Sequence, residues 1–356
     1  MKLSRISSLL ALVTALGVML FVALSRLSYP FELEWMESMT LRTVQWLVLG
    51  RTIYPAPSME FVAYPYTPLF FYTSYLAADV VGVGFAPMRL TSLVASLVSF
   101  WYLFRMLRST LDDRAAMFGT ALYVASYSLS GYWFDVARVD AMFMSLSIAG
   151  TFHFLRHTTR DYLIAALLFA LAAFTKQTAL LIALPLCVYA LIKYRAKSLW
   201  FSLPLGVLVL SAIAIFHFAT DGWFTYYSFG FMRNQIYKDG YVPHLLWHDL
   251  AKPLPILFLM SCAGLWLLIK KRMSELPLDL LITVLAYVAA ALYVDSHMAS
   301  FKNDLMPMYL GLAVIFAVLI DRISLAYPRY AMWTAIAATL QVLMILPGFQ
   351  HQIPTE

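Results

Sequence analysis

Long runs of apolar residues, separated by short polar interruptions, fill most of the chain. Eleven runs are long enough to cross a bilayer, or nearly so, since about 20 helical residues span a 30 Å hydrocarbon core. They are residues 6–25, 90–104, 115–134, 141–155, 162–175, 177–192, 198–220, 253–269, 280–294, 305–320 and 330–349. The pattern predicts an all-α polytopic membrane protein with about 11 transmembrane helices.

The composition agrees with this prediction. Hydrophobic residues make up 62% of the chain and charged residues only 12%, with a mean hydropathy of +0.76. A soluble domain usually carries about 25% charged residues. We expect a single transmembrane domain over residues 1–356, with no soluble domain. The formal charge of +6 does not imply a nucleic-acid partner, because membrane orientation accounts for where the basic residues fall.

Basic residues recur in short loops on one side of the predicted bundle, provided that residues 66–83 lie along the interface and do not cross. The loop residues are Lys2 and Arg5; Arg105, Arg108 and Arg114; Arg156 and Arg160; Lys193, Arg195 and Lys197; Lys270, Lys271 and Arg272; and Arg322 and Arg329. The positive-inside rule makes this side cytoplasmic. The external side then carries a long first loop, residues 26–89, and a second large loop, residues 221–252.

The first external loop holds two helix-like pieces, residues 34–49 and 66–83. Gly50 is a natural stop for the first piece, and the second begins after Pro65. Aromatic residues crowd both, as they do at membrane interfaces. We therefore expect two interfacial helices in this loop.

The carboxylates Glu32, Glu34 and Glu37 directly follow the first apolar stretch. Acids held beside a bilayer are costly, which indicates function. On a helix, Glu34 and Glu37 would point to one side, and either could take a proton from an attacking hydroxyl. The alternative is that acids simply favour a helix N-terminus.

Arg138 and Asp140 stand at the external mouth of a predicted helix, either facing a cavity or forming an ion pair that fixes the helix end. Lys176 interrupts an apolar run, next to Gln177 and two threonines. This group could bind a phosphate, or Lys176 could be a snorkelling lysine at a tight turn.

A third polar group, His297, Lys302 and Asn303, precedes a predicted helix, and Lys302 could also neutralise a phosphate.

His244 and His248 are spaced like a metal pair, but the glutamate that follows the first histidine in the metalloprotease motif is missing. We expect no cofactor and leave a divalent metal open.

Several motifs together resemble the multipass, lipid-dependent glycosyltransferases of the GT-C superfamily, in the branch of the protein mannosyltransferases and aminoarabinose transferases. They are Glu34-Trp-Met-Glu37, Gly50-Arg-Thr-Ile-Tyr54, Tyr64-Pro-Tyr-Thr-Pro68, Ala137-Arg138-Val-Asp140-Ala141, Thr175-Lys176-Gln177 and Lys302-Asn303-Asp304-Leu-Met-Pro307. Their order along the chain and their common external side make the set specific.

The resemblance implies a polyprenyl-phosphate-linked sugar as donor, with a lipid, glycan or protein as acceptor, and transfer of a hexosyl or pentosyl group. The early acid of the first loop would be the catalytic base, which maps onto Glu34 with Glu37 beside it. The family often has Asp at the first position, so the choice between the two stays open.

The remaining candidates complete the site that the resemblance implies. Asp140 would be a second acidic group, and Tyr64 and Tyr66 would bind substrate together with the basic and amide residues named above. A single displacement would invert the anomeric centre. We expect an integral protein of the plasma (inner) membrane with its active site on the external, periplasmic side.

Three further classes of function stay open. A lipid-linked sugar transporter or flippase should carry charges deep in several helices and repeat symmetry, whereas the charges here gather at helix ends. A polysaccharide polymerase or ligase should have a long catalytic loop late in the chain, for which residues 221–252 are the candidate. A noncatalytic membrane subunit would not need the external acids.

Overall fold

The computed structural model describes residues 2–234, 236–270 and 277–354. Within these ranges the protein is built from helices and has no strand, only an isolated bridge between Tyr237 and His297. The predicted all-α fold is confirmed. Lys271 and Arg272, expected on the cytoplasmic side, lie outside the described residues. The helices form two compact units.

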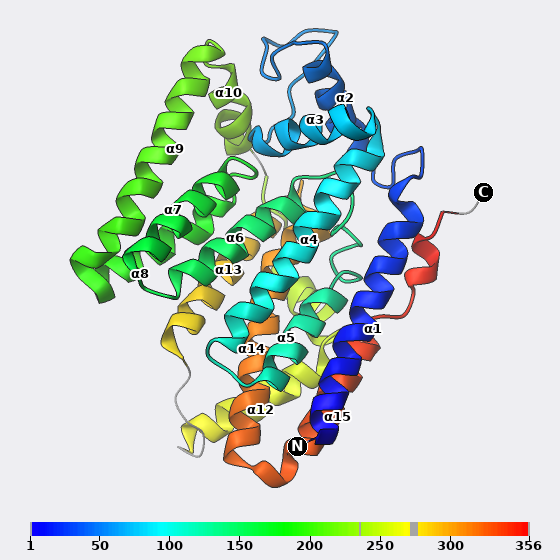
Figure 1. The fold of residues 1–356 in the computed structure, drawn as a ribbon, viewed down its shortest axis with the longest axis vertical. Helices are drawn as coiled ribbons and strands as arrows, with labels where there is room; N and C mark the ends of the chain where they lie inside the picture. Colours follow the sequence, from blue (N-terminus) through cyan, green and yellow to red (C-terminus); the bar gives the residue numbers. More distant parts are fainter. Residues whose placement is uncertain (1, 235, 271–276, 355–356) are drawn as a thin grey trace. The chain divides into compact units, whose positions relative to one another are not determined.

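One unit consists of residues 1–25, 100–132 and 237–356. Its main helices are α1 (Lys2–Leu27), α5 (Asp113–Ala125), α12 (Pro255–Ile269), α13 (Leu278–Asp295), α14 (Met306–Ala326) and α15 (Ala331–Met344). Helix α14 packs against α5, α12, α13 and α15 (Figure 1). A Cβ on Gly119 would lie 2.7 Å from Cβ of Ala317 and 2.9 Å from the carbonyl oxygen of Ala313. The missing side chain therefore lets α5 approach α14 directly, as small residues do between membrane helices.

The other unit consists of residues 26–99 and 133–236. It contains α2 (Glu37–Val48), α3 (Leu69–Val81), the first part of α4 (Phe85–Arg108), α6 (Asp140–Phe154), α7 (Thr159–Ala173), α8 (Ala179–Tyr194), α9 (Leu199–Ala219) and α10 (Trp223–Thr225). Helix α7 packs against α6 and α9 (Figure 1). Aromatic residues of the 26–89 segment, among them Tyr54, Phe70 and Phe71, share a buried cluster with Phe224. This segment is therefore packed into the core of its unit.

Local sequence explains where these helices begin and end. Helix α3 starts after Pro68 and stops at Gly82, whose φ of +100° favours glycine. Helix α7 is capped by the preceding residue, Thr158, whose hydroxyl accepts the backbone N–H of Asp161 at 3.1 Å. Both bounds follow the signals that sequence reasoning uses.

The expected helix over residues 34–49 begins three residues later, at Glu37. Glu34 lies in a preceding turn, in which the Glu37 N–H donates to the carbonyl of Glu34 at 2.9 Å. The backbone before this turn binds a buried arginine side chain instead of forming helical hydrogen bonds. The expectation that Glu34 and Glu37 share one helix face is therefore wrong.

Six helical segments within the described ranges are long and apolar enough to cross a membrane: Leu3–Leu27, Phe85–Arg108, Ala179–Ala219, Leu278–Asp295, Lys302–Ala326 and Pro328–Gln352. A pair bent by 99°, Tyr241–Ala251 with Pro255–Ile269, would make seven. Each of the eleven predicted stretches contains a helix, but α5, α6 and α7 have only 13, 15 and 15 residues. The predicted number of spans is therefore not confirmed.

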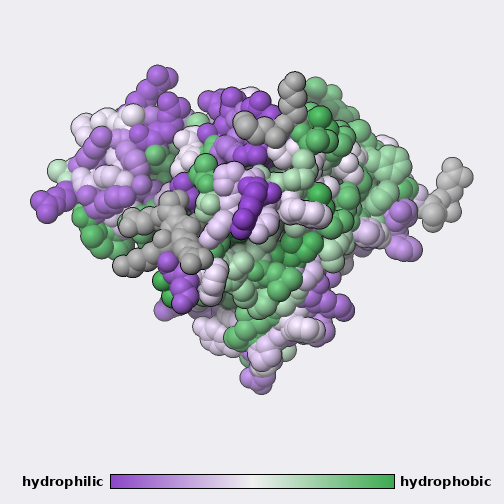
Figure 2. Space-filling view, turned by 90° about the horizontal axis from the view of Figure 1, so that it is seen from below, coloured by the Kyte–Doolittle hydropathy of each residue, from purple (hydrophilic) through white to green (hydrophobic). Residues whose placement is uncertain are grey.

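Large apolar side chains stand exposed on these helices, for example Phe218 at 79% and Ile192 at 75%. The surface shown in Figure 2 has broad hydrophobic areas, with hydrophilic residues gathered in separate groups. Such exposure suits lipid and not water. The chain is an integral membrane protein.

Candidate active site

The residues singled out from the sequence fall into the two units unequally. Glu34, Glu37, Tyr64, Tyr66, Arg138, Asp140, Lys176 and Gln177 all belong to the unit of residues 26–99 and 133–236. His297, Lys302 and Asn303 belong to the other unit. The first group contains the ion pairs and hydrogen bonds that define a site.

Glu37, the first residue of α2, is fully buried and saturated with hydrogen bonds. Arg89 of α4 donates to it through Nε at 3.1 Å and Nη2 at 2.7 Å. The backbone N–H groups of Leu33 and Ala137 each donate at 2.6 Å. With four donors on two oxygens, this carboxylate has little capacity left to accept a proton from a substrate.

Glu34 has a different environment. Its Oε2 accepts a hydrogen bond from Arg138 Nη1 at 2.8 Å, a backbone hydrogen bond at Met36 also favours the carboxylate, and its side chain is 9% exposed. Its Oε1 has no hydrogen-bond partner among the described residues. Burial raises the pKa of this carboxyl above its usual value, outweighing the charge and hydrogen bond of Arg138, which lower it. Glu34 therefore offers an oxygen that can take a proton.

Three aromatic rings surround the Arg138 guanidinium, whose carbon lies 4.8 Å from the ring centre of Trp133, 5.4 Å from Tyr64 and 5.7 Å from Tyr66. Arg138 also donates to the hydroxyl of Tyr66 at 3.3 Å. The predicted Tyr64 and Tyr66 thus lie beside the predicted Arg138. The aromatic faces hold the cation next to Glu34.

A second buried ion pair joins Lys176 and Asp140. Lys176 Nζ, in the turn between α7 and α8, lies 2.6 Å from Oδ1 of Asp140, the first residue of α6. Lys176 Nζ is also 5.8 Å from the ring centre of Tyr66. Tyr66 therefore lies near both cations, and the site contains two carboxylates and two cationic side chains.

The turn that carries Lys176 is fixed to the segment before α3. Gln177 Nε2 donates to the carbonyls of Pro65 at 2.9 Å and Ser228 at 2.5 Å. The hydroxyl of Thr67 donates to the carbonyl of Ala173 at 2.8 Å, and the Leu69 N–H to that of Phe174 at 2.7 Å. In this structure Gln177 holds the backbone in place.

Sequence reasoning missed Arg89 and the pair formed by Arg26 and Asp135. Both members of that pair are buried, and Arg26 Nε lies 2.6 Å from Asp135 Oδ2. From the sequence, Arg89 marks only the end of the first external loop. Its position directly before an apolar stretch was the available signal, because an arginine there must find partners in the protein.

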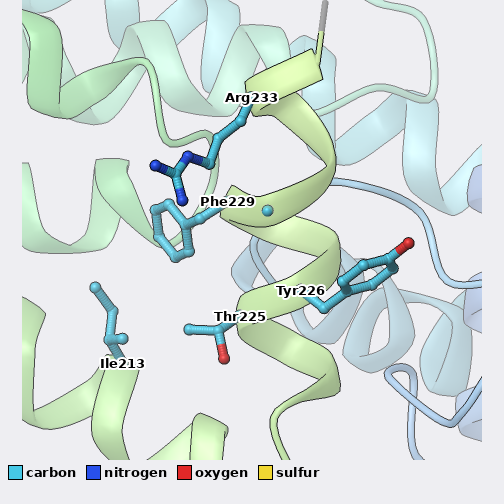
Figure 3. A pocket seen from close by; sticks show the side chains of 6 residues that line it. Ile213, Thr225, Tyr226, Phe229 and Arg233 are labelled. Atoms are coloured by element: carbon cyan, nitrogen blue, oxygen red, sulfur yellow. The ribbon is translucent and has the colours of Figure 1, made fainter.

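An apolar hollow of about 450 Å³ lies in the same unit, between α9 and the helical segment that follows α10. Its lining includes Ile213 of α9, Thr225, Phe229 and Arg233. Figure 3 shows Arg233 on the same side as the Phe229 ring, while Tyr226 points away. Ser228, whose carbonyl binds Gln177, belongs to this segment, so the segment that lines the hollow also contacts the turn of Lys176.

The three predicted residues of the other unit have their own surroundings. His297 is buried, with its ring centre 4.7 Å from that of Tyr237. Asn303 is buried and Lys302 exposed in the short helix Lys302–Leu305. Their convergence with Glu34 stays a prediction.

No group of three or more His, Cys, Asp or Glu side chains able to hold a metal occurs in the part of the chain that the structure describes. His244 Nδ1 lies 3.4 Å from Asp249 Oδ2, and the His248 ring is stacked on the His244 ring. Two imidazoles and one carboxylate in this arrangement do not form a metal-binding group.

Comparisons with known proteins agree with the predicted resemblance. The model of the family described as dolichyl-phosphate-mannose-protein mannosyltransferase matches residues 65–223. That range includes Arg138, Asp140, Lys176 and Gln177, while Glu34 and Glu37 precede it. No curated protein sequence is matched significantly.

The fold is similar to that of ArnT from Cupriavidus metallidurans, both in its apo state and bound to undecaprenyl phosphate. The TM-score is 0.69 in both cases, with 14% and 13% sequence identity. The aligned parts cover 96% of this chain and 76% of ArnT. The chain thus has the ArnT fold and resembles the mannosyltransferase family over residues 65–223, and the predicted GT-C resemblance is confirmed.

Proposed function

We propose that this protein is a glycosyltransferase that moves a sugar from a polyprenyl-phosphate donor to an acceptor hydroxyl, with Glu34 as general base. The single observation that carries the proposal is the Glu34 carboxylate itself. It is largely buried, paired with one arginine, and has an oxygen that accepts no hydrogen bond from the described residues.

The reaction is a single displacement. The acceptor hydroxyl attacks the anomeric carbon while its proton passes to Glu34, and the bond from that carbon to the phosphate oxygen breaks. The sugar passes through an oxocarbenium-like state, and the configuration at the anomeric carbon inverts. The lipid phosphate leaves with the bonding electron pair as an anion.

A leaving phosphate needs positive charge more than it needs a proton. Lys176 and Arg138 supply that charge within the same unit as Glu34. Asp140 holds Lys176 in place, and Tyr64 and Tyr66 flank Arg138. The hollow beside Arg233, apolar with one cation, suits the phosphate end of a polyprenyl chain.

The positive-inside pattern supports an external, periplasmic site in a plasma (inner) membrane. His297, Lys302 and Asn303 would contribute to substrate binding on that side. The transferred group would be a hexosyl or pentosyl unit, and the acceptor a lipid, glycan or protein.

The purified protein in lipid nanodiscs, incubated with polyprenyl-phosphate sugars and candidate acceptors, tests the proposal. We expect release of polyprenyl phosphate that depends on acceptor and is lost in Glu34→Gln. Movement of the intact lipid-linked sugar between leaflets without its cleavage would instead identify a flippase and overturn the proposal.

A further inference from the structure

All hydrogen-bond donors of the Arg89 side chain bind one short stretch of chain, residues 26–37. A guanidinium has five N–H donors. Two go to Glu37, and three go to the carbonyl oxygens of Arg26 at 3.0 Å, Tyr29 at 2.6 Å and Phe31 at 2.6 Å. The side chain is 0% exposed. Arg89 thus shapes the turn that presents Glu34.

Glu37 links that turn to the segment of Arg138. Besides Arg89, it accepts the N–H of Leu33, directly before the turn, and that of Ala137, directly before Arg138. The Glu37 carboxylate therefore binds the backbone next to both members of the Glu34–Arg138 pair. Its own oxygens have no room for a substrate proton.

The first part of α4 binds the Arg138 segment as well. The hydroxyl of Ser92 donates to the carbonyl of Arg138 at 3.2 Å, and that of Ser96 to the carbonyl of Phe134 at 2.5 Å. With Arg89, these side chains recur at helical spacing along one side of α4. One rigid helix therefore holds the backbone of both segments.

We propose that Arg89 and Glu37 are positioning residues that set the distance and orientation of Glu34 relative to Arg138. This inference rests on the proposed function of Glu34. It assigns the second glutamate of the Glu-Trp-Met-Glu motif to geometry and not to proton transfer. The misplacement of a reacting group by about 1 Å can cost about 100-fold in rate, so the pair acts on the chemical step without touching substrate.

A purely structural role is the competing explanation. A buried ion pair is weak support for stability, because apolar residues of similar volume often serve as well. Here the bonds that the pair makes to other residues go to the stretch from Arg26 to Leu33, which leads into Glu34, and to Ala137, directly before Arg138. That distribution is what a positioning role requires.

The test compares Arg89→Lys with a matched control, Arg51→Lys. Lysine keeps the charge but has three donors instead of five. Arg51 lies in the same loop and pairs with Glu60 at 3.4 Å, but its side chain is 50% exposed. We expect Arg89→Lys to lower kcat about 100-fold with KM within about threefold, and Arg51→Lys to change neither.

Hydrogen exchange supplies a readout that does not need activity. In Arg89→Lys, amides of residues 29–37 and 134–138 should exchange faster than in the wild type, while those of α7 stay protected. If the wild type transfers no sugar but this pattern appears, the proposed function fails and the positioning geometry stands. Unchanged kcat and exchange in Arg89→Lys would overturn the positioning proposal.

Gly150→Ala separates positioning from general loss of stability. Its Cβ would lie 2.9 Å from the Phe169 ring, in the packing of α6 against α7 and away from Glu34. If Gly150→Ala lowers kcat per folded molecule as much as Arg89→Lys does, the effect is only structural. Should Arg89→Lys fail to fold, Glu37→Gln is judged by the same criteria, and failure of both to fold would show that the pair serves the fold.

Discussion

Glu34 and Glu37 are the same residue type, three positions apart, in opposite surroundings. Glu37 is 0% exposed and accepts four hydrogen bonds, two of them from Arg89. Glu34 is 9% exposed and accepts one side-chain hydrogen bond, from Arg138. A carboxylate saturated with donors has no acceptor site left for a substrate proton, whereas one with an open oxygen does.

The difference teaches that the number of hydrogen-bond partners, and not burial or an arginine partner alone, separates the two roles. Both acids are largely buried and both pair with arginine. Only Glu34 keeps an acceptor site that the described residues leave open. The following predictions break or sharpen this comparison.

The largest effect should be on stability. Glu37→Ala leaves Arg89 buried without its partner, and we expect the free energy of unfolding to fall by about 3–5 kcal/mol. Glu34→Ala also leaves a buried arginine without this partner, but it removes fewer hydrogen bonds and the charge of Asp140 still acts on Arg138, so the loss should be smaller. Unfolding in mixed detergent, followed by circular dichroism, measures both. Equal losses would remove the distinction between the two acids.

Lys176 should matter for the leaving phosphate. We expect Lys176→Met to lower kcat/KM about 100-fold or more, since one stabilising group at a developing anion is worth about 10²–10³. Lys176→Arg, which keeps the charge, should retain most of the activity. Steady-state transfer in nanodiscs measures both variants. Equal activity of Lys176→Met and wild type would exclude this role.

The pH profile should report the environment of Glu34. A base works only when ionised, so kcat/KM falls as pH drops through its pKa, and burial raises that pKa above the usual value for glutamate. The acid limb should therefore lie higher than for an exposed glutamate. Removing the Arg138 charge takes away an influence that lowers the pKa, so the limb of Arg138→Gln should move to higher pH. A downward move would contradict the assignment.

The smallest effect is expected at an exposed pair of the same loop. Arg51 and Glu60 lie 3.4 Å apart with side chains 50% and 75% exposed. Glu60→Gln should change the free energy of unfolding by less than about 1 kcal/mol and leave transfer unaltered. Thermal unfolding and the nanodisc assay check this, and a loss comparable to that of Glu37→Ala would mean that burial does not set the cost.

Much of the fold was predictable because membrane helices carry a strong apolar signal. Each apolar run contains a helix, and Pro68, Gly82 and Thr158 mark helix ends by local rules. The number of spans was not predictable in this way, because runs such as those of α6 and α7 form helices of only 15 residues. Length and hydropathy do not decide whether such a helix crosses.

The site was predictable as a set of residues but not as pairs. Motif order brought together Glu34, Arg138, Asp140 and Lys176, which lie in one unit. The pairing of Glu37 with Arg89 joins residues 52 positions apart, and no local pattern encodes it. The three-residue spacing of Glu34 and Glu37 suggests a shared helix face. In the structure, the backbone carbonyls that precede Glu34 bind Arg89, and the helix begins only at Glu37.

The most direct test measures binding and chemistry in one protein, Glu34→Gln. We expect it to bind polyprenyl phosphate as the wild type does, because the cations of Lys176 and Arg138 remain. Its single-turnover rate of sugar transfer should fall about 10²–10⁴-fold, the usual contribution of a general base. Transfer at the wild-type rate with Gln at this position would contradict the account.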